Sequence, residues 1–222
     1  MSETSFRRTP IQHLLEPLKP VWLPDSQSPI VLRYRTREQE QAAMRKLGLC
    51  DLSGLSRLGL KGAAAANWLR KQSLPVPEQV YASEHLSDGG IIVRLGMTEF
   101  LLESSLQDIV VPQLDILLTS QGNQLIRVER QDASFLLVGS QAREVLVQTC
   151  GVNFREVSNH TWVFTRLAGV SCGILSYLHQ GAPAYPLWFD CSYAVYLWET
   201  LFEIVSELEG ALIGVGILDE PE

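Results

Sequence analysis

The sequence has no long hydrophobic run, and this absence argues against a spanning helix. No apolar stretch approaches the ~20 residues that a transmembrane helix needs. Residues 1–20, MSETSFRRTPIQHLLEPLKP, hold two arginines but no apolar segment of the kind found in signal peptides. We therefore expect a cytoplasmic protein.

Cysteine is scarce and its spacing does not fit a metal site. The four cysteines lie far apart, with no C-x-x-C motif and no nearby histidine pair. They are Cys50, Cys150, Cys172 and Cys191. This pattern favours small buried side chains in a reducing compartment, although spacing does not decide whether any two of them form a disulfide.

Positive charge is also in short supply. The chain holds 18 Lys and Arg against 25 Asp and Glu, which gives a net charge of −7 and argues against a nucleic-acid-binding surface. The first fifty residues reverse this balance, with eight basic against five acidic residues, so a local basic patch remains open. With 46% hydrophobic residues, the chain of 222 residues suits one large domain or two small ones.

The motifs of common catalytic sites are missing as well. There is no G-x-S-x-G nucleophile motif and no phosphate-binding loop. GVGILDE, residues 214–220, has too few glycines for a dinucleotide site. The four histidines are isolated in the sequence, at His13, His85, His160 and His179. We interpret each histidine as a surface residue or a satisfied polar residue, and we predict no metal site.

Proline divides the chain. Residues 1–31 contain five of the eleven prolines and therefore predict an extended arm, with about the first ten residues disordered. We predict a domain over residues 32–210 and a C-terminal strand with an acidic tail over 211–222. The arm carries two candidate partner contacts, Trp22 and Leu23, and its alternative is to fold back over its own domain.

The periodicity of the domain predicts alternating helices and strands. We expect helices over 36–48 (N-cap Thr36), 63–72, 106–122 (delayed or kinked by Pro112), 140–151 (N-cap Ser140) and 192–210. We expect a half-exposed strand over 48–62, hairpins over 89–104 and 161–178 (turning at Ala168–Gly169), two strands over 123–140, and one over 185–192. In the last helix the predicted buried face is Leu197, Trp198, Leu201, Phe202, Val205 and Leu208, and the solvated stripe is Glu199, Glu203 and Glu207.

Two strand-to-helix joints look alike. They are GLKGAAAANWL at 59–69 and LLVGSQAREVL at 136–146. Any α+β domain can place Gly or Ser at such joints. The sharper interpretation is an α+β fold of two related halves that share an antiparallel sheet.

Four blocks carry a resemblance to a known family. EQAAMRKLGLCDLSGLSRLGLKGAAAANWLRK (40–71), YASEHLSDGGIIVRLGMTEFLLES (81–104) and ASFLLVGSQAREVL (133–146) resemble the T-protein of the glycine cleavage system, an aminomethyltransferase. LVQTCGVNFREVSNHTWVFTRLAGVSCGIL (146–175) resembles the gamma subunit of heterotetrameric sarcosine oxidase more closely. The resemblance covers about residues 20–208. It implies two ferredoxin-like halves with antiparallel sheet and no extra C-terminal domain.

The chain departs from the family's catalytic pattern. The family's G-G-x-x-D-D run is reduced to Gly89 and Gly90, and Asp88 precedes rather than follows them. Ala182 stands where the family's G-E-x-G-F-E motif has a pterin-binding Glu. The K-G-C-x-x-G-Q motif of related iron–sulfur repair proteins is not reproduced around Cys150. Each pterin donor left without a partner would cost about 1–3 kcal/mol, so catalysis and pterin affinity should both be lost.

The resemblance thus implies a non-catalytic subunit like sarcosine oxidase gamma, which supports a folate-linked flavin amine oxidase complex. No cofactor would bind tightly, flavin would be held only by partner subunits, and tetrahydrofolate is the one candidate ligand. The alternatives are a stand-alone tetrahydrofolate-binding protein with a rearranged pocket and an active aminomethyltransferase.

In the family that the sequence resembles, the two halves surround a funnel through which folate enters, and this implies candidate positions for the pocket in this chain. We expect Tyr81, Asp88, Arg94 and Tyr185 near the remnant of the folate pocket, with ordinary loop residues as the alternative. Trp188 and Phe189 join Trp22 and Leu23 as candidate partner contacts. Asp51 and Ser53, at the family's entry into its first core strand, are interpreted as structural groups that satisfy nearby backbone donors.

Overall fold

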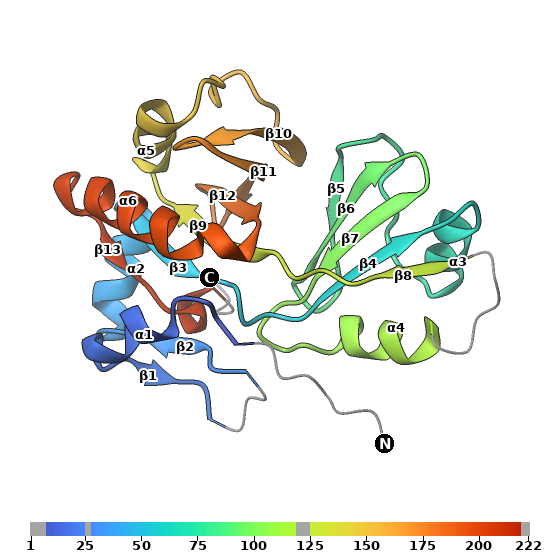
Figure 1. Cartoon of the computed structure of the whole chain (residues 1–222), viewed down its shortest axis with the longest axis horizontal. Coiled ribbons are helices and arrows are strands. Elements are labelled where there is room, and N and C mark those ends of the chain that lie inside the picture. Colours follow the sequence, from blue (N-terminus) through green and yellow to red (C-terminus); the bar gives the residue numbers. More distant parts are fainter. Residues whose placement is uncertain (1–7, 25–27, 119–124, 219–222) are drawn as a thin grey trace. The chain divides into compact units, whose positions relative to one another are not determined.

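The computed structural model describes residues 8–24, 28–118 and 125–218 (Figure 1). These residues form two compact units. Unit 1 comprises residues 1–54, 132–159 and 163–222, and unit 2 comprises residues 55–131 and 160–162.

Unit 2 is an antiparallel sheet of five strands with two helices. Its strand order is β5-β6-β7-β4-β8. In chain order its elements are β4 (Arg57–Lys61), α3 (Ala65–Lys71), β5 (Ser83–His85), β6 (Ile91–Gly96), β7 (Glu99–Glu103), α4 (Val110–Leu118) and β8 (Ile126–Val128).

Unit 1 contains a six-stranded sheet with the order β10-β11-β12-β9-β3-β13. Its N-terminal elements are α1 (Gln12–Leu15), η1 (Glu16–Leu18), β1 (Val21–Trp22), β2 (Val31–Arg33), α2 (Arg37–Lys46) and β3 (Gly48–Asp51). The C-terminal elements are β9 (Ala133–Val138), α5 (Ala142–Thr149), β10 (Thr161–Leu167), β11 (Val170–His179), β12 (Ala182–Phe189), η2 (Cys191–Tyr193), α6 (Ala194–Glu207), β13 (Ala211–Leu212) and η3 (Val215–Ile217).

The two units repeat one topology. Each runs strand, helix, three strands, helix, strand, and in each the first strand of the run lies beside the fourth. In unit 2 the last strand, β8, pairs directly with the first, β4. In unit 1 strand β3 lies between the equivalent strands β9 and β13. The predicted α+β fold of two related halves is confirmed.

The predicted sharing of one sheet is wrong, because each half has its own sheet. The expected half-exposed strand over 48–62 is likewise two strands, β3 and β4, which enter different sheets. A turn at residues 52–56 separates them, and β4 is buried except at Lys61.

The helices follow the sequence signals closely. Helix α2 begins after Thr36, the predicted N-cap, and Thr36 also forms a capping box with Gln39 that was not predicted. Helix α4 starts late, at Val110, and so accommodates Pro112 in its first turn. Helix α5 begins one residue later than expected, with Gln141 rather than Ser140 at its N-cap.

Helix α6 buries most of the predicted stripe. Leu197, Trp198, Leu201 and Val205 are buried in the core of unit 1. Phe202 is 37% exposed, so its predicted burial is wrong. Consecutive helical residues differ by about 100° around the axis, which places Phe202 beyond the edge of the face that Leu201 defines.

The N-terminal arm is part of unit 1 rather than an extended segment. It forms α1, η1 and β1, with Pro17 in the first turn of η1. Ile11 and Leu15 are fully buried in the core of unit 1, because the apolar side chains between the prolines find partners there. The predicted disorder of the first ten residues and the acidic tail fall largely outside the described residues.

Candidate functional site

Three of the four predicted pocket residues, Tyr81, Asp88 and Arg94, lie in unit 2. A backbone hydrogen bond joins Tyr81 to Arg94. Tyr81 has a positive φ of 69°, and its side chain is exposed. Its N–H donates to the carbonyl of Arg94 at 2.7 Å, and its carbonyl accepts from Trp162 at 2.7 Å. Tyr81 is therefore held at one end of β6 with its ring at the surface.

Arg94 organises the loops around it. Its guanidinium donates to the carbonyl oxygens of Pro77 (3.2 Å), Glu78 (2.7 Å), Gly96 (3.3 Å) and Met97 (2.8 Å). It also lies 5.5 Å from the centre of the Phe100 ring. The guanidinium N–H groups of Arg94 are therefore used in hydrogen bonds to backbone carbonyls of this chain.

Asp88 lies at the opposite end of β6. Its two carboxylate oxygens accept from Gly90 N–H at 3.1 Å and from Val110 N–H at 3.0 Å. The second bond caps the start of α4. Asp88 is 8% exposed, and its carboxylate connects the Gly89–Gly90 turn to that helix.

Replacing Asp88 with Ala should lower the free energy of unfolding by about 2–3 kcal/mol, because two backbone donors lose their acceptor. Asp88→Asn keeps one carbonyl oxygen and should cost less. Urea unfolding followed by tryptophan fluorescence measures both. The exposed Asp115→Ala variant is the control, and an Asp88→Ala loss no larger than that of this variant would contradict the assignment.

Tyr185 lies in unit 1, in the interior. It is fully buried in the core, where its hydroxyl accepts from Arg143 Nε at 2.6 Å. Its ring packs edge-on against Phe154 with centroids 5.5 Å apart. Because Tyr185 belongs to the other unit, the described geometry does not join it to Tyr81, Asp88 and Arg94.

Two histidines that are distant in sequence meet in unit 2. The rings of His85 and His160 form a T-shaped contact with centroids 5.4 Å apart, and His160 Nδ1 lies 3.4 Å from Ser83 Oγ. His85 keeps part of its surface in solvent, but the partial loss of solvent around its ring lowers its pKa below the usual value of 6.5; the neighbouring His160 lowers this pKa further, while Glu84 opposes the change. Sequence spacing could not reveal this pair, because strand pairing of residues 82 and 161 brings it together.

The lowered pKa of His85 makes stability depend on pH. The native protein binds fewer protons at this site than the unfolded chain, so the contribution of His85 is present above pH 6.5 and is lost as the pH falls through that value. We expect the urea midpoint to fall between pH 7.5 and pH 5.5, and His85→Gln to reduce that fall. His13→Gln at an exposed site is the control. An unchanged pH dependence in His85→Gln would refute the prediction.

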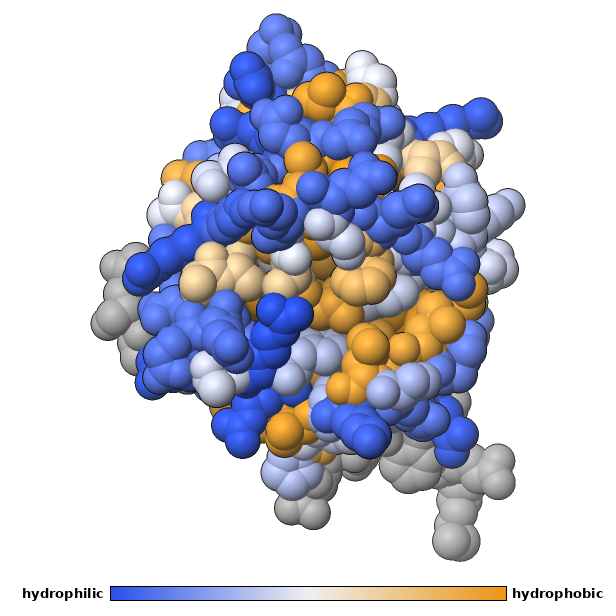
Figure 2. Space-filling model, turned by 90° about the vertical axis from the view of Figure 1, so that its left-hand side faces the viewer, coloured by the Kyte–Doolittle hydropathy of each residue, from blue (hydrophilic) through white to orange (hydrophobic). Residues whose placement is uncertain are grey.

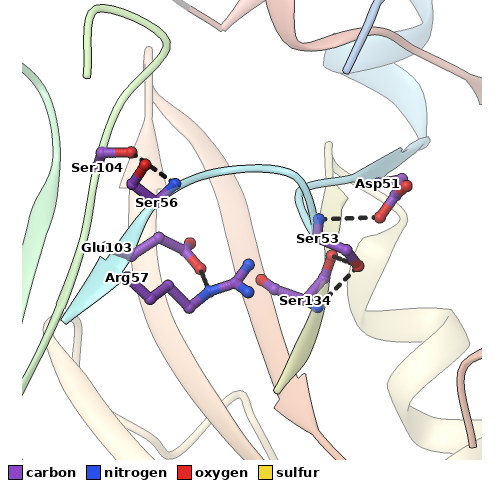
Figure 3. A network of polar contacts seen from close by, with 7 residues as sticks. All are labelled: Asp51, Ser53, Ser56, Arg57, Glu103, Ser104 and Ser134. Carbon is purple, nitrogen blue, oxygen red and sulfur yellow. Dashed lines mark hydrogen bonds and ion pairs between the residues drawn. The ribbon is translucent and has the colours of Figure 1, made fainter. Parts of the chain in front are cut away.

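Asp51 and Ser53 join two strands of unit 1 (Figure 3). The Asp51 carboxylate accepts from Ser53 N–H at 2.9 Å. The Ser53 hydroxyl accepts from Ser134 N–H at 3.1 Å and donates to Ser134 carbonyl oxygen at 3.2 Å. These bonds connect the end of β3 to β9, which confirms the interpretation of both residues as partners of nearby backbone groups.

Glu40 was not singled out from the sequence. It is 2% exposed, and its carboxylate accepts from the N–H groups of Tyr34 (2.6 Å), Arg35 (3.2 Å) and Gly214 (3.3 Å). Burial raises the pKa of the Cys50 thiol, and Asp51 and Glu40 raise it further. The thiol therefore stays protonated and unreactive at neutral pH.

A buried ion pair lies in unit 2. Arg57 on β4 and Glu103 on β7 face each other in register and form a salt bridge (Figure 3). Their side chains are 0% and 5% exposed. Nothing in the local sequence identified this pair, since the two residues are 46 positions apart.

The candidate partner contacts divide into two groups. Trp22 and Leu23 are partly buried, and Trp22 packs against the core of unit 1. Trp188 and Phe189 on β12 are 4% and 2% exposed, and Phe189 belongs to that core. Only the first two expose a substantial part of their side chains.

Within the described residues no group of three or more His, Cys, Asp or Glu side chains could hold a metal ion. In the same residues no helix is long and apolar enough to cross a membrane.

Comparison with known proteins identifies the fold. No family model matches the sequence. The chain is 22% identical to an aminomethyltransferase from Exiguobacterium sibiricum over 216 residues, 91% of this chain and 60% of that protein. The glycine cleavage system aminomethyltransferase T of Bartonella henselae superposes with a TM-score of 0.76 at 18% identity, over 96% of this chain and 61% of that one. The chain has the T-protein-like fold.

The same fold occurs in heterotetrameric sarcosine oxidase from Corynebacterium sp. U-96, crystallised with pyrrole 2-carboxylate. One of its chains matches with a TM-score of 0.63 and 20% identity, over 92% of this chain and 97% of that one. In contrast, this chain spans about 60% of the length of the two aminomethyltransferases. The T-protein-like fold therefore occurs both in an aminomethyltransferase and in an oxidase assembly.

Proposed function

We propose that this protein is a non-catalytic subunit, similar to the gamma subunit of heterotetrameric sarcosine oxidase, of a flavin-dependent amine oxidase complex in the cytoplasm. In this role the chain binds its partner subunits, and the flavin is held by those partners. Its contribution to one-carbon metabolism is to stabilise the complex rather than to transfer a carbon unit.

The observation that supports this proposal best is that the buried carboxylates are hydrogen-bonded or ion-paired to groups of the same chain. The buried acidic residues in the described part of the chain are Glu40, Asp51, Asp88 and Glu103. Each accepts from a donor of the same chain: backbone N–H groups for the first three and Arg57 for the fourth. Asp88 is nearest in sequence to the family's catalytic pair, and both its oxygens are used to hold the backbone.

The geometry around the two altered motifs supports the same conclusion. Strand β6 starts at Ile91, directly after the Gly89–Gly90 turn. At Gly90 an added Cβ would lie 2.7 Å from the carbonyl oxygen of Glu103, so this turn has no room for a side chain there. Ala182 begins β12 after a left-handed turn at Gln180–Gly181. A methyl group at this position offers a pterin no acceptor.

Titration with tetrahydrofolate tests the loss of the pocket. We expect calorimetry to show no binding tighter than about 0.1 mM, equivalent to about 5.5 kcal/mol. Micromolar affinity would replace the proposal with a stand-alone tetrahydrofolate-binding protein. Turnover of an aminomethyl donor with tetrahydrofolate would instead identify the protein as an active aminomethyltransferase.

Co-purification from the source organism tests the subunit role directly. A tagged chain expressed at its native level should retain a flavoprotein in constant ratio, with an interface of about 2,000 Å² or more. Trp22→Ala should weaken this association more than it lowers stability, since Trp22 is a large aromatic residue that stays partly exposed in the described part of the arm. A monomer without flavin from every preparation would refute the proposal.

A further inference from the structure

We propose that the exposed face of α6 is the surface by which this chain binds a partner protein that presents lysine side chains next to apolar groups. The surface, called here the α6 face, comprises Tyr193 at the N-cap of α6 and the helix residues Tyr196, Glu199, Phe202, Glu203 and Glu207. This inference rests on the proposed subunit function and assigns a location and a chemistry to the interface.

The first observation is aromatic exposure on a well-anchored helix. Tyr193, Tyr196 and Phe202 are 50%, 51% and 37% exposed, although the opposite face of α6 lies in the core of unit 1. On the side of unit 1 that faces the viewer in Figure 2, exposed apolar groups are likewise interspersed among hydrophilic ones. Tyrosine and phenylalanine are enriched at the centres of protein interfaces and depleted from ordinary solvated surfaces.

The second observation is the charge of the same face. Glu199, Glu203 and Glu207 follow one another at intervals of four residues and are all exposed. Like charges at this spacing destabilise a helix, and the described residues show no ion pair to any of the three. The chain has no Lys or Arg from residue 167 to its last residue, while eight Asp and Glu occur there. Lys46 pairs with the neighbouring Glu209, whereas the carboxylates of Glu199, Glu203 and Glu207 face solvent, so a binding partner can supply their counter-charge.

The third observation is that the face is held in place before binding. The Tyr196 hydroxyl donates to the carbonyl of Ala168 in the β10–β11 turn at 3.0 Å. The hydroxyls of Thr200 and Ser206 donate to the carbonyls one helical turn earlier, those of Tyr196 and Phe202. An ordered surface loses little conformational entropy on binding. It also leaves the carboxylates and rings as the groups that a partner meets.

These three observations select the partner's chemistry. A row of carboxylates repels nucleic acid and anionic membranes and attracts ammonium groups. Aromatic rings beside the carboxylates offer apolar area and a π face to the same cations. A protein surface with lysines flanked by aliphatic side chains satisfies both requirements.

The test uses the tagged full-length chain and the complex it forms in its source cells. A carbodiimide joins a carboxylate to a lysine amine with loss of water, so it records ion pairs as covalent amides. We expect mass spectrometry to find Glu199, Glu203 or Glu207 joined to a partner lysine. We also expect Glu199→Lys/Glu203→Lys to reduce the co-purified partner at least tenfold, and Phe202→Ser at least threefold.

The control makes the same change in net charge on unit 2 instead of on α6. Glu78→Lys/Glu129→Lys alters two exposed acids of unit 2 and should leave the partner yield unchanged. Circular dichroism confirms that each variant is folded, and Glu203→Gln provides a milder variant should the double reversal not fold. Equal losses in the control pair and the α6 pair would show a general charge effect and overturn the inference.

The outcomes separate this inference from the proposed function. A flavoprotein whose yield is insensitive to every α6 variant overturns the inference and leaves the function intact. A partner without flavin that is cross-linked to the α6 face and lost in the variants overturns the function and supports the inference. Absence of any stoichiometric partner overturns both.

Discussion

Gly139→Ala is expected to lower the free energy of unfolding by about 4 kcal/mol, the sum of backbone strain and a steric clash. Gly139 has a φ of 116°, which L-residues rarely adopt. A Cβ there would lie 2.6 Å from both the carbonyl carbon and the carbonyl oxygen of Lys46. Because these are backbone atoms at the end of α2, no side-chain rotation can relieve the clash.

The surroundings of Gly139 explain why the backbone cannot move away. Its N–H donates to the Pro183 carbonyl at 2.9 Å. The next two N–H groups, of Ser140 and Gln141, donate to the carbonyls of Arg45 and Lys46, each at 2.9 Å. The strand-to-helix joint between β9 and α5 is thus bonded to the end of α2.

Gly169→Ala is the matched control for this prediction. Gly169 has a comparable left-handed φ of 85°, but nothing lies within 4 Å of its added Cβ. Strain alone should cost about 1–2 kcal/mol. Urea unfolding followed by fluorescence, to which Trp198 contributes in the core of unit 1, measures both variants. Similar losses of unfolding free energy in the two variants would show that the close approach of the Cβ to Lys46 does not dominate the cost of Gly139→Ala.

Removing one partner of the buried Arg57–Glu103 ion pair is expected to cost about 3–5 kcal/mol, because it leaves the other charge buried without its partner. The variants are Arg57→Met and Glu103→Leu, which keep most of the side-chain volume. The two side chains are almost fully buried on neighbouring strands β4 and β7. Solvent cannot compensate the remaining charge there.

The double variant Arg57→Met/Glu103→Leu should be more stable than either single variant, because both charges are then removed. The exposed pair Arg127–Asp115 serves as the control, with side chains 43% and 37% exposed. Breaking that pair should change stability by about 1 kcal/mol or less. A double variant less stable than both single variants would contradict the assignment of the loss to an unpaired charge.

Local sequence patterns determined most of the secondary structure. The Thr36–Gln39 capping box, the run of alanines before Trp68 and the stripe that includes Leu197 and Leu201 each specify a helix through residues within four or five positions. The turn at Ala168–Gly169 similarly specified the β10–β11 hairpin. These elements could be predicted because the interactions that select them are short in sequence.

The tertiary structure alone decided where the polar groups are used. In the sequence, Asp88 lies close to the position of the family's catalytic acid, on the other side of the glycine pair. In the structure, its carboxylate caps a helix that starts 22 residues later. Arg57 and Glu103, and His85 and His160, meet only because strands pair across long stretches of chain. The separation of β3 and β4 into two sheets has the same origin, since sheet membership depends on remote partners rather than on the five residues between the strands. Burial requires the charges of Asp88, Arg57 and Glu103 to find partners, and only the folded chain determines which partners those are.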